Sequence, residues 1–106
     1  MIKNPFVTLN NKINSELGED NKVIFVKVRS EYVDDIISGK KKSELRKNDR
    51  EYSVGDLLYL QEITEDNKFT GRLIIVKITH ILQDEEYLQK DYACLSIEYI
   101  KTISNK

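Results

Sequence analysis

Residues 38–56 read SGKKKSELRKNDREYSVGD, and this stretch connects the two halves of the predicted fold. Gly39 stands where the C-terminal cap of a preceding helix belongs, because glycine tolerates the left-handed backbone that ends many helices. Residues 43–46 predict a short extended piece, and residues 47–51 predict a loop. Val54-Gly55-Asp56 marks a tight turn into a strand. The stretch therefore predicts a helix end, a short strand, a loop and a turn, in that order.

The flanking sequence supplies the other elements. Residues 23–29, VIFVKVR, predict a strand because β-branched and aromatic residues dominate it and Val26 and Val28 alternate with charged neighbours. Ser30 is the expected N-cap of a short helix that ends at Gly39. Further strands are expected at 57–63, at 69–82 with a bend near Gly71, and at 92–100. We therefore predict an α+β fold: a mostly antiparallel β-barrel of about five strands with one or two short helices.

The same pattern predicts which residues are buried and how the chain divides. The expected core residues are Leu45, Leu57, Leu60, Ile75, Leu95 and Ile97. Cys94 is expected inside the barrel as a small hydrophobic residue, and His80 is expected to be a structural histidine among apolar neighbours. Residues 1–22 are interpreted as an N-terminal extension with a short helix around 11–18, and residues 23–106 as the domain.

Composition excludes several classes of protein. The chain has 106 residues, which suits one domain, and it has no apolar run long enough to cross a membrane. Its single cysteine rules out an internal disulfide. The single histidine leaves no cluster of metal ligands, so neither a metal nor another cofactor is expected. No secretory signal is recognisable at the N-terminus, and a reducing cytoplasm is the expected compartment.

Charge is concentrated in one segment. The net charge is only −1, yet residues 39–50 carry six basic side chains against two acidic ones. A compact positive segment on an otherwise acidic chain indicates an anionic ligand. The alternative is a solvated loop that only keeps the protein soluble, and charge alone does not separate the two interpretations.

The segment also carries a motif. Residues 39–46, GKKKSELR, fit the pattern G-x-K-x-x-E-x-R, and RKNDR and VGD follow in the same stretch. This order resembles a bacterial and phage family of ASCH domains within the PUA-like superfamily. FTGR at 69–72 and YACLSI at 92–97 also fit that family, so the resemblance covers about residues 23–100. It implies a PUA-like barrel with a cleft beside the motif loop that binds RNA or a modified nucleoside or nucleotide.

The resemblance also suggests two enzymatic alternatives. Some ASCH proteins are amidohydrolases that remove the acetyl group of N4-acetylcytidine, and others are ribonucleases. Lys41 and Glu44 would then be the catalytic pair. Small bacterial amidohydrolases carry threonine at the position of Glu44 and use a downstream glutamate, for which Glu85 and Glu86 are the nearest candidates. A carboxylate at position 44 would pair with Lys41, and a paired ammonium binds anions well but attacks carbonyl carbon poorly. The sequence therefore favours binding over catalysis.

The predicted ligand-binding side chains come mostly from the basic segment. Phosphate contacts suit Lys40, Lys42, Lys47 and Arg50. The pair of Glu44 and Arg46 suits the donor and acceptor edge of a base. A mutual ion pair is the alternative for Glu44 and Arg46, and turn formation is the alternative for Asn48. Tyr52 and Tyr92 are candidate stacking surfaces. The full predicted set is Lys40, Lys41, Lys42, Glu44, Arg46, Lys47, Asn48, Arg50 and Tyr92.

A third interpretation is a role in protein contacts. Residues 84–91, DEEYLQKD, form an acidic turn that would suit a protein partner, for example a host factor blocked by a phage product. The identity of the partner and the oligomeric state are not encoded in any motif of the chain.

Overall fold

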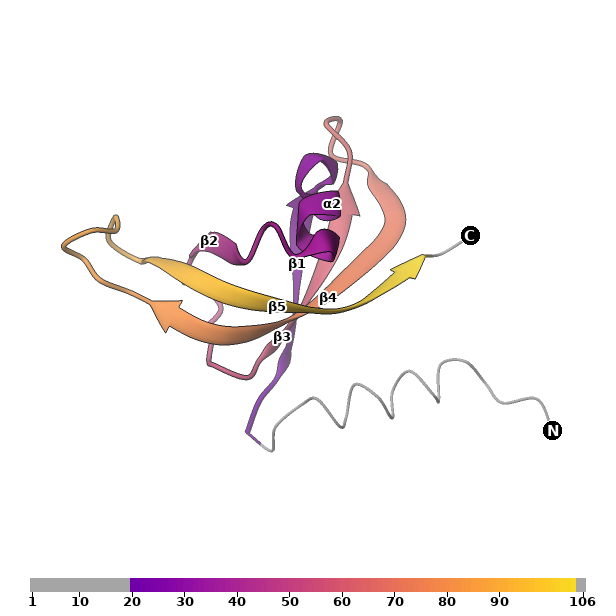
Figure 1. Cartoon of the computed structure of the whole chain (residues 1–106). Coiled ribbons are helices and arrows are strands. Elements are labelled where there is room, and N and C mark those ends of the chain that lie inside the picture. Colours follow the sequence, from indigo (N-terminus) through magenta and orange to yellow (C-terminus); the bar gives the residue numbers. More distant parts are fainter. Residues whose placement is uncertain (1–19, 105–106) are drawn as a thin grey trace.

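The protein is described from a computed structural model, which places residues 20–104. Five strands form one sheet with the order β1-β3-β4-β5-β2. The elements are β1 (Val23–Arg29), α2 (Ser30–Ser38), β2 (Ser43–Lys47), β3 (Leu57–Ile63), β4 (Phe69–Leu82) and β5 (Tyr92–Ser104). The sheet curls into a half-barrel around α2 (Figure 1). The predicted α+β fold with about five strands and a short helix is confirmed at this level.

The strand pairing leaves the sheet with two free edges. β1 pairs with β3 in parallel, which requires a crossover between them, and α2 and β2 lie within that connection. β3, β4 and β5 form an antiparallel meander, and β2 pairs antiparallel with β5. β1 and β2 are therefore the outermost strands. Because the sheet is curved, its two edges approach each other instead of pointing in opposite directions.

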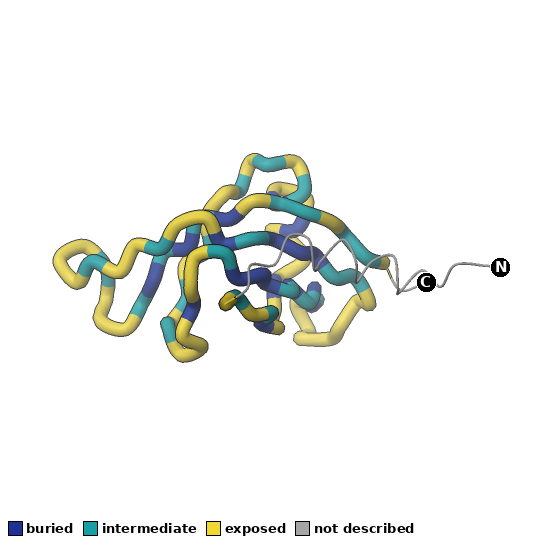
Figure 2. Tube along the Cα trace, turned by 90° about the horizontal axis from the view of Figure 1, so that it is seen from below, coloured by how far each residue is buried: buried dark blue, intermediate teal, exposed yellow. Residues whose placement is uncertain are grey.

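The core fills the concave side of the sheet. Val33 and Ile36 of α2 are buried in one cluster with residues of β1, β3, β4 and β5. Along the sheet, buried positions alternate with partly buried or exposed ones (Figure 2). Alternation along each strand explains this arrangement, because successive side chains point to opposite faces. A smaller cluster on the other face is centred on Leu57 and Ile75. The predicted burial of Leu57, Leu60, Ile75, Leu95 and Ile97 is confirmed.

Two residues of the predicted core lie elsewhere. Leu45 is 60% exposed, although we expected it to be buried. It lies opposite Cys94 in the β2–β5 pair, and the neighbours of Cys94, Ala93 and Leu95, point into the core. Leu45 and half-buried Cys94 must therefore share the outer face. The prediction of Cys94 as an interior residue is wrong for the same reason. Glu44 and Arg46 share the opposite, inner face of β2, where both are half-buried.

The expected environment of His80 is also wrong. His80 is exposed on β4, so it is not a histidine enclosed by apolar neighbours.

The helix ends as predicted but begins one residue earlier. Gly39 has φ 83° and donates its backbone N–H to Ile36 O at 3.2 Å, which is a left-handed C-terminal cap. Ser30 is the first helical residue, and Arg29 occupies the N-cap position. The Ser30 hydroxyl is directed away from the helix, because it donates to Ile63 O on β3 at 3.1 Å. Ser30 therefore ties the helix start to the sheet and does not cap it.

A buried carboxylate lies at the irregularity between β3 and β4. The register shifts between Gln61 and Ile63, and Gly71 has φ 90° in the opposing segment. This bulge brings Thr70 and Arg72 onto Glu62, whose carboxylate accepts hydrogen bonds of 2.7 Å from Thr70 and of 2.9 and 2.8 Å from Arg72. Hydrogen bonding to Arg72 outweighs burial and lowers the pKa of Glu62 to about 2.

The predicted helix at 11–18 lies outside the described residues, as does the N-terminal extension up to residue 19. Within residues 20–104, no helix is long and apolar enough to cross a membrane.

Replacing Gly39 by alanine tests the helix cap. A Cβ at this position would meet no atom within 4 Å, so the cost comes from the backbone conformation alone. We expect a loss of about 1 kcal/mol in unfolding free energy, measured by thermal and denaturant melts. Gly39→Asn is the matched control and should lose less, because asparagine enters the left-handed region more readily. Equal stability of Gly39→Ala and the wild type would contradict this cap.

Replacing Glu62 by glutamine tests the buried carboxylate. The pKa of Glu62 is lowered from 4.5 to about 2, so its stabilising contribution is complete above pH 4.5 and is lost as the pH falls toward 2. At pH 7, Glu62→Gln should cost about 1.5–3 kcal/mol, the range for hydrogen bonds to charged groups. Denaturant melts from pH 7 to pH 2 should show a weaker acid dependence for this variant. Glu65→Gln, in the exposed adjacent turn, should behave like the wild type, and an unchanged acid dependence in Glu62→Gln would refute the assignment.

Candidate functional site

The two edges of the half-barrel are bridged by one side chain. The Arg46 guanidinium on β2 donates a hydrogen bond to the backbone carbonyl of Lys27 on β1. A cavity of about 330 Å³ opens at this junction, and we call it the seam cavity. It lies where a closed barrel would have paired β1 with β2.

Cationic and aromatic side chains line the seam cavity. β1 contributes one cation, β2 contributes two, and the loop after β2 contributes the fourth together with one carboxylate. The lining residues are Phe25, Val26, Lys27, Arg46, Lys47, Asp49, Arg50, Tyr52 and Gln61. A cavity with four cations and one carboxylate attracts anions, and because it is concave it concentrates their field.

Two aromatic rings lie in this lining in different environments. Phe25 is 52% exposed and contacts Tyr59 edge-to-face at 5.1 Å between ring centroids. The Tyr59 contact fixes one side of the Phe25 ring, so an exposed part remains for stacking. Tyr52 is buried, and this burial raises the pKa of its phenol. Phe25 is thus the accessible ring of the cavity and Tyr52 is part of its wall.

Glu44 lies between the cations of the motif. Its carboxylate is 3.7 Å from Lys41 Nζ and 3.6 Å from Arg46 Nη2. These are ion-pair distances, too long for good hydrogen bonds. Glu44 Oε2 and Arg46 Nε are buried and have no hydrogen-bond partner among the described residues. Buried polar atoms are nearly always satisfied in folded proteins, so this pair of atoms has capacity for a bound water or ligand group.

Lys41 is held by three contacts on the other side of Glu44. Its ammonium donates to the Ser43 carbonyl, pairs with Glu44 and lies 5.6 Å from the centre of the Tyr32 ring. Lys41 also lines a second cavity of about 380 Å³ beside the end of α2, which we call the helix-end cavity. The lining residues of this cavity are Ile36, Gly39, Lys41, Lys42, Thr79, Ile97, Glu98 and Tyr99.

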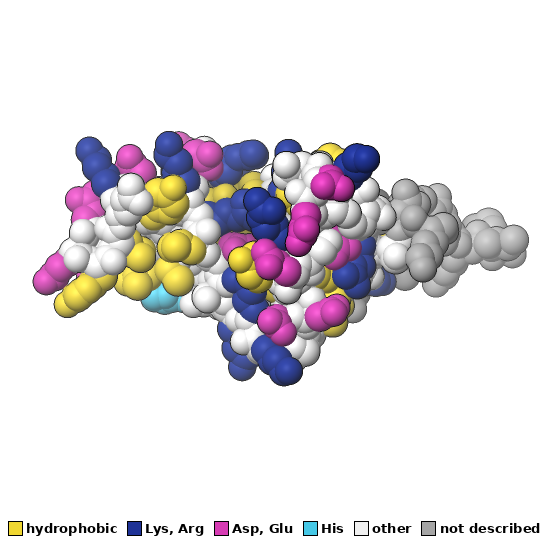
Figure 3. All heavy atoms as spheres, turned by 90° about the horizontal axis from the view of Figure 1, so that it is seen from above, with side chains coloured by type: hydrophobic (Ala, Val, Ile, Leu, Met, Phe, Trp, Pro, Cys, Tyr) yellow, Lys and Arg dark blue, Asp and Glu magenta, His cyan; other side chains and the backbone are white. Residues whose placement is uncertain are grey.

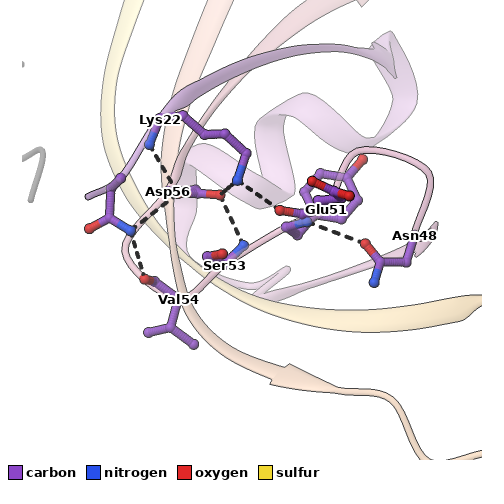
Figure 4. Close-up of polar contacts among 8 residues, drawn as sticks. Lys22, Asn48, Glu51, Ser53, Val54 and Asp56 are labelled. Atoms are coloured by element: carbon purple, nitrogen blue, oxygen red, sulfur yellow. Dashed lines mark hydrogen bonds and ion pairs between the residues drawn. The ribbon is translucent and has the colours of Figure 1, made fainter.

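The loop that carries Arg50 is anchored at both ends. Asn48 donates its backbone N–H to Asp91 O at 2.7 Å, and its side chain accepts from Tyr52 N at 3.3 Å. At the other end, the buried Asp56 carboxylate accepts hydrogen bonds from Ser53 N at 2.9 Å and Lys22 Nζ at 2.8 Å (Figure 4). Burial opposes the ionisation of Asp56, but hydrogen bonds from Lys22, Ser53 and Asn21 outweigh it and lower the pKa. The loop therefore has a fixed position beside the cavity.

The predicted site residues separate into two groups. Arg46, Lys47 and Arg50 line the seam cavity, whereas Lys41 and Lys42 line the helix-end cavity. Glu44 connects the groups through its two ion pairs. Lys40 is exposed in the connection between α2 and β2. The Asn48 side chain accepts a hydrogen bond from Tyr52 N and so helps to fix the loop that carries Arg50. Tyr92 is half-buried on β5 opposite Lys47. Neither Lys40, Asn48 nor Tyr92 is among the side chains that line the two cavities.

Sequence reasoning missed the contribution of β1 and β3 to the site. Phe25 and Lys27 fall on the solvent-facing side of a predicted strand, which offered a signal, because an exposed phenylalanine beside a lysine needs a reason. Gln61 carried no such signal. No group of three or more His, Cys, Asp or Glu side chains within residues 20–104 is arranged to hold a metal ion.

A second surface lies on the outer face beside the site. Leu45 is opposite Cys94, and Cys94 is opposite Leu82, so these three residues form a row across β2, β5 and β4. Leu82 is 43% exposed and Tyr87, in the acidic turn that follows, is 78% exposed. Figure 3 shows hydrophobic side chains gathered toward one end of the molecule, with charged side chains of both signs over its middle.

A comparison with known proteins places the chain in a family. The family model described as "Domain of unknown function (DUF3850)" matches residues 25–97. The chain is also similar to the "Uncharacterized 12.9 kDa protein in GpA 3'region" of Escherichia phage P2, with 39% identity over 74 residues. That alignment covers 70% of this chain and 66% of the phage protein.

The matched span runs from β1 to β5 and contains α2, β2, the anchored loop and every residue that lines the seam cavity. The lining of the helix-end cavity extends beyond the span to Glu98 and Tyr99. Since the family model covers more than half of the chain, this protein belongs to the DUF3850 family.

Proposed function

We propose that this protein is a PUA-like, ASCH-type module that binds single-stranded RNA or a nucleotide at the seam cavity. The observation that carries the proposal is the composition of this cavity: four cationic side chains and an exposed phenylalanine in a space of about 330 Å³. Cations neutralise phosphates, and an aromatic face stacks on a base of any sequence. Proteins that recognise single strands combine these two features.

The arrangement of the cations supports binding to a backbone. Lys47 and Arg50 are exposed, and Arg50 makes a long ion pair with Asp49, at 3.9 Å between half-exposed groups. An ion pair of this kind contributes little and is easily replaced by a phosphate. Arg46 is held by Glu44 and the Lys27 carbonyl, so it suits positioning more than phosphate capture. Lys47 and Arg50 are therefore the proposed phosphate contacts.

The catalytic alternative has weaker support. An amidohydrolase or ribonuclease that relies on Lys41 needs a free amine or a mobile proton at that position. The Lys41 ammonium is engaged by Ser43 O, Glu44 and the Tyr32 ring. Glu85 and Glu86 are exposed in the turn after β4 and line neither cavity. The proposed function is accordingly binding without rapid turnover.

A protein contact is the second candidate function. The row of Leu45, Cys94 and Leu82 favours it, because exposed apolar side chains next to an acidic turn are typical of interaction surfaces. Purification followed by mass spectrometry separates the two functions. Co-eluting RNA or nucleotide supports the first, and a co-eluting protein without nucleic acid supports the second.

The salt dependence of binding tests the proposed phosphate contacts. We expect Lys47→Ala/Arg50→Ala to weaken binding of single-stranded RNA in a filter-binding titration at low salt. The slope of log K against log salt should become shallower by about 1.4, or about 0.7 for each lost contact. Lys68→Ala/Lys101→Ala removes two exposed lysines that do not line the cavities and should keep the wild-type slope. If both double variants keep the wild-type slope, the seam cavity is not the site of RNA binding.

A second assay tests the prediction of slow chemistry. Wild-type protein incubated with N4-acetylcytidine should release cytidine slowly or not at all, as followed by chromatography, because the Lys41 amine is held in its ion pair. The same assay with the Lys41→Ala variant shows whether any release depends on Lys41. Rapid release by the wild type that disappears in Lys41→Ala would make the protein a hydrolase and overturn the proposal.

A further inference from the structure

The two cavities lie at opposite ends of the same short strand. Lys41 and Lys42 precede β2 and line the helix-end cavity, while Arg46 and Lys47 end β2 and line the seam cavity. Four residue steps separate Lys42 from Arg46, which is about 13 Å of extended chain. Nucleotides stacked as in a DNA strand are about 3.4 Å apart, and those of an unstacked single strand are farther apart, so this distance equals at most about four nucleotide steps.

The helix-end cavity has a lining suited to a nucleotide. Ile36, Ile97 and Tyr99 give it apolar walls, and Glu98 adds an exposed carboxylate that accepts hydrogen bonds from amino groups. Lys42 is exposed at its rim, where it suits a phosphate. Its volume of about 380 Å³ is similar to the 330 Å³ of the seam cavity. Each cavity is in the size range of small-ligand sites.

Glu44 lies on β2 between the residues that line the two cavities, although it lines neither cavity itself. Its carboxylate repels a phosphate, so the group that faces it must be neutral and able to donate a hydrogen bond. Glu44 Oε2 is a buried acceptor and Arg46 Nε is a buried donor, and neither makes a hydrogen bond within residues 20–104. A ribose hydroxyl or a base edge offers both functions, whereas the phosphates remain near the lysines on each side.

We infer that the two cavities are subsites of one site, and that the ligand is a single-stranded RNA, of which at most about five nucleotides are bound across β2. This inference rests on the proposed function and narrows it from a nucleotide to an oligonucleotide. One end of the bound RNA occupies the seam cavity near Phe25, and the other end occupies the helix-end cavity near Lys42. A mononucleotide fills only one subsite and gains nothing from the other.

Oligouridylates of one to eight nucleotides, titrated calorimetrically into the full chain, test the inference. Affinity should rise by about 10²-fold between one and five nucleotides, because the second subsite is then filled within one molecule, and should level off beyond five. Lys42→Glu should remove most of this gain. Lys101→Glu, an equal charge reversal on an exposed residue of β5 outside the helix-end cavity, should retain the gain.

The results distinguish this inference from the proposed function. Equal affinity for uridine monophosphate and the octamer would overturn the two-subsite inference and leave nucleotide binding intact. Equal losses in Lys42→Glu and Lys101→Glu would also overturn it, because the effect would then be one of overall charge. Failure of every length to bind, including the octamer at low salt, would refute both the proposed function and the inference.

Discussion

The buried carboxylate of Asp56 ties the start of β1 to the start of β3. It accepts a hydrogen bond of 3.0 Å from Lys22 N, directly before β1, while Asp56 itself directly precedes β3. The Asp56 carbonyl accepts from Ile78 N of β4 at 2.9 Å. The carboxylate also carries the ion pair with Lys22 Nζ. The parallel register of β1 and β3 begins at Val23 and Leu57, immediately after this network, so the position of the β1 edge depends on it.

The candidate site is a consequence of that register and of an incomplete barrel. β1 and β2 approach each other without pairing, and one arginine spans the gap to a backbone carbonyl that a neighbouring strand would otherwise use. Polar backbone groups at a sheet edge need partners, and Arg46 supplies one in the absence of a strand. The same opening forms the seam cavity. The motif residues thus satisfy the edge of the sheet and line the cavity at the same time.

Local chemistry made much of the fold predictable. Gly39, the alternation of Val26 and Val28, and the turn glycines each encode a conformation through nearby atoms, and these predictions are confirmed. Leu45 was misplaced because alternation gives two faces but does not say which is inside. Its face was decided by pairing with Cys94, a contact that is distant in the sequence. The division of the basic segment between two cavities, and the contribution of Phe25 and Lys27, also required the tertiary arrangement.

The Asp56 network has a further consequence for the order in which the structure forms. Lys22 and Asp56 are separated by 34 positions, whereas β3 and β4 are joined by a short turn. Closing a long loop costs more chain entropy than closing a short one, and parallel pairing is slow for the same reason. We therefore expect the β3–β4–β5 meander to form first and β1 to join it late. In that order of events, β1, the edge strand that completes the seam cavity, is the last part of the sheet to form and the first to separate.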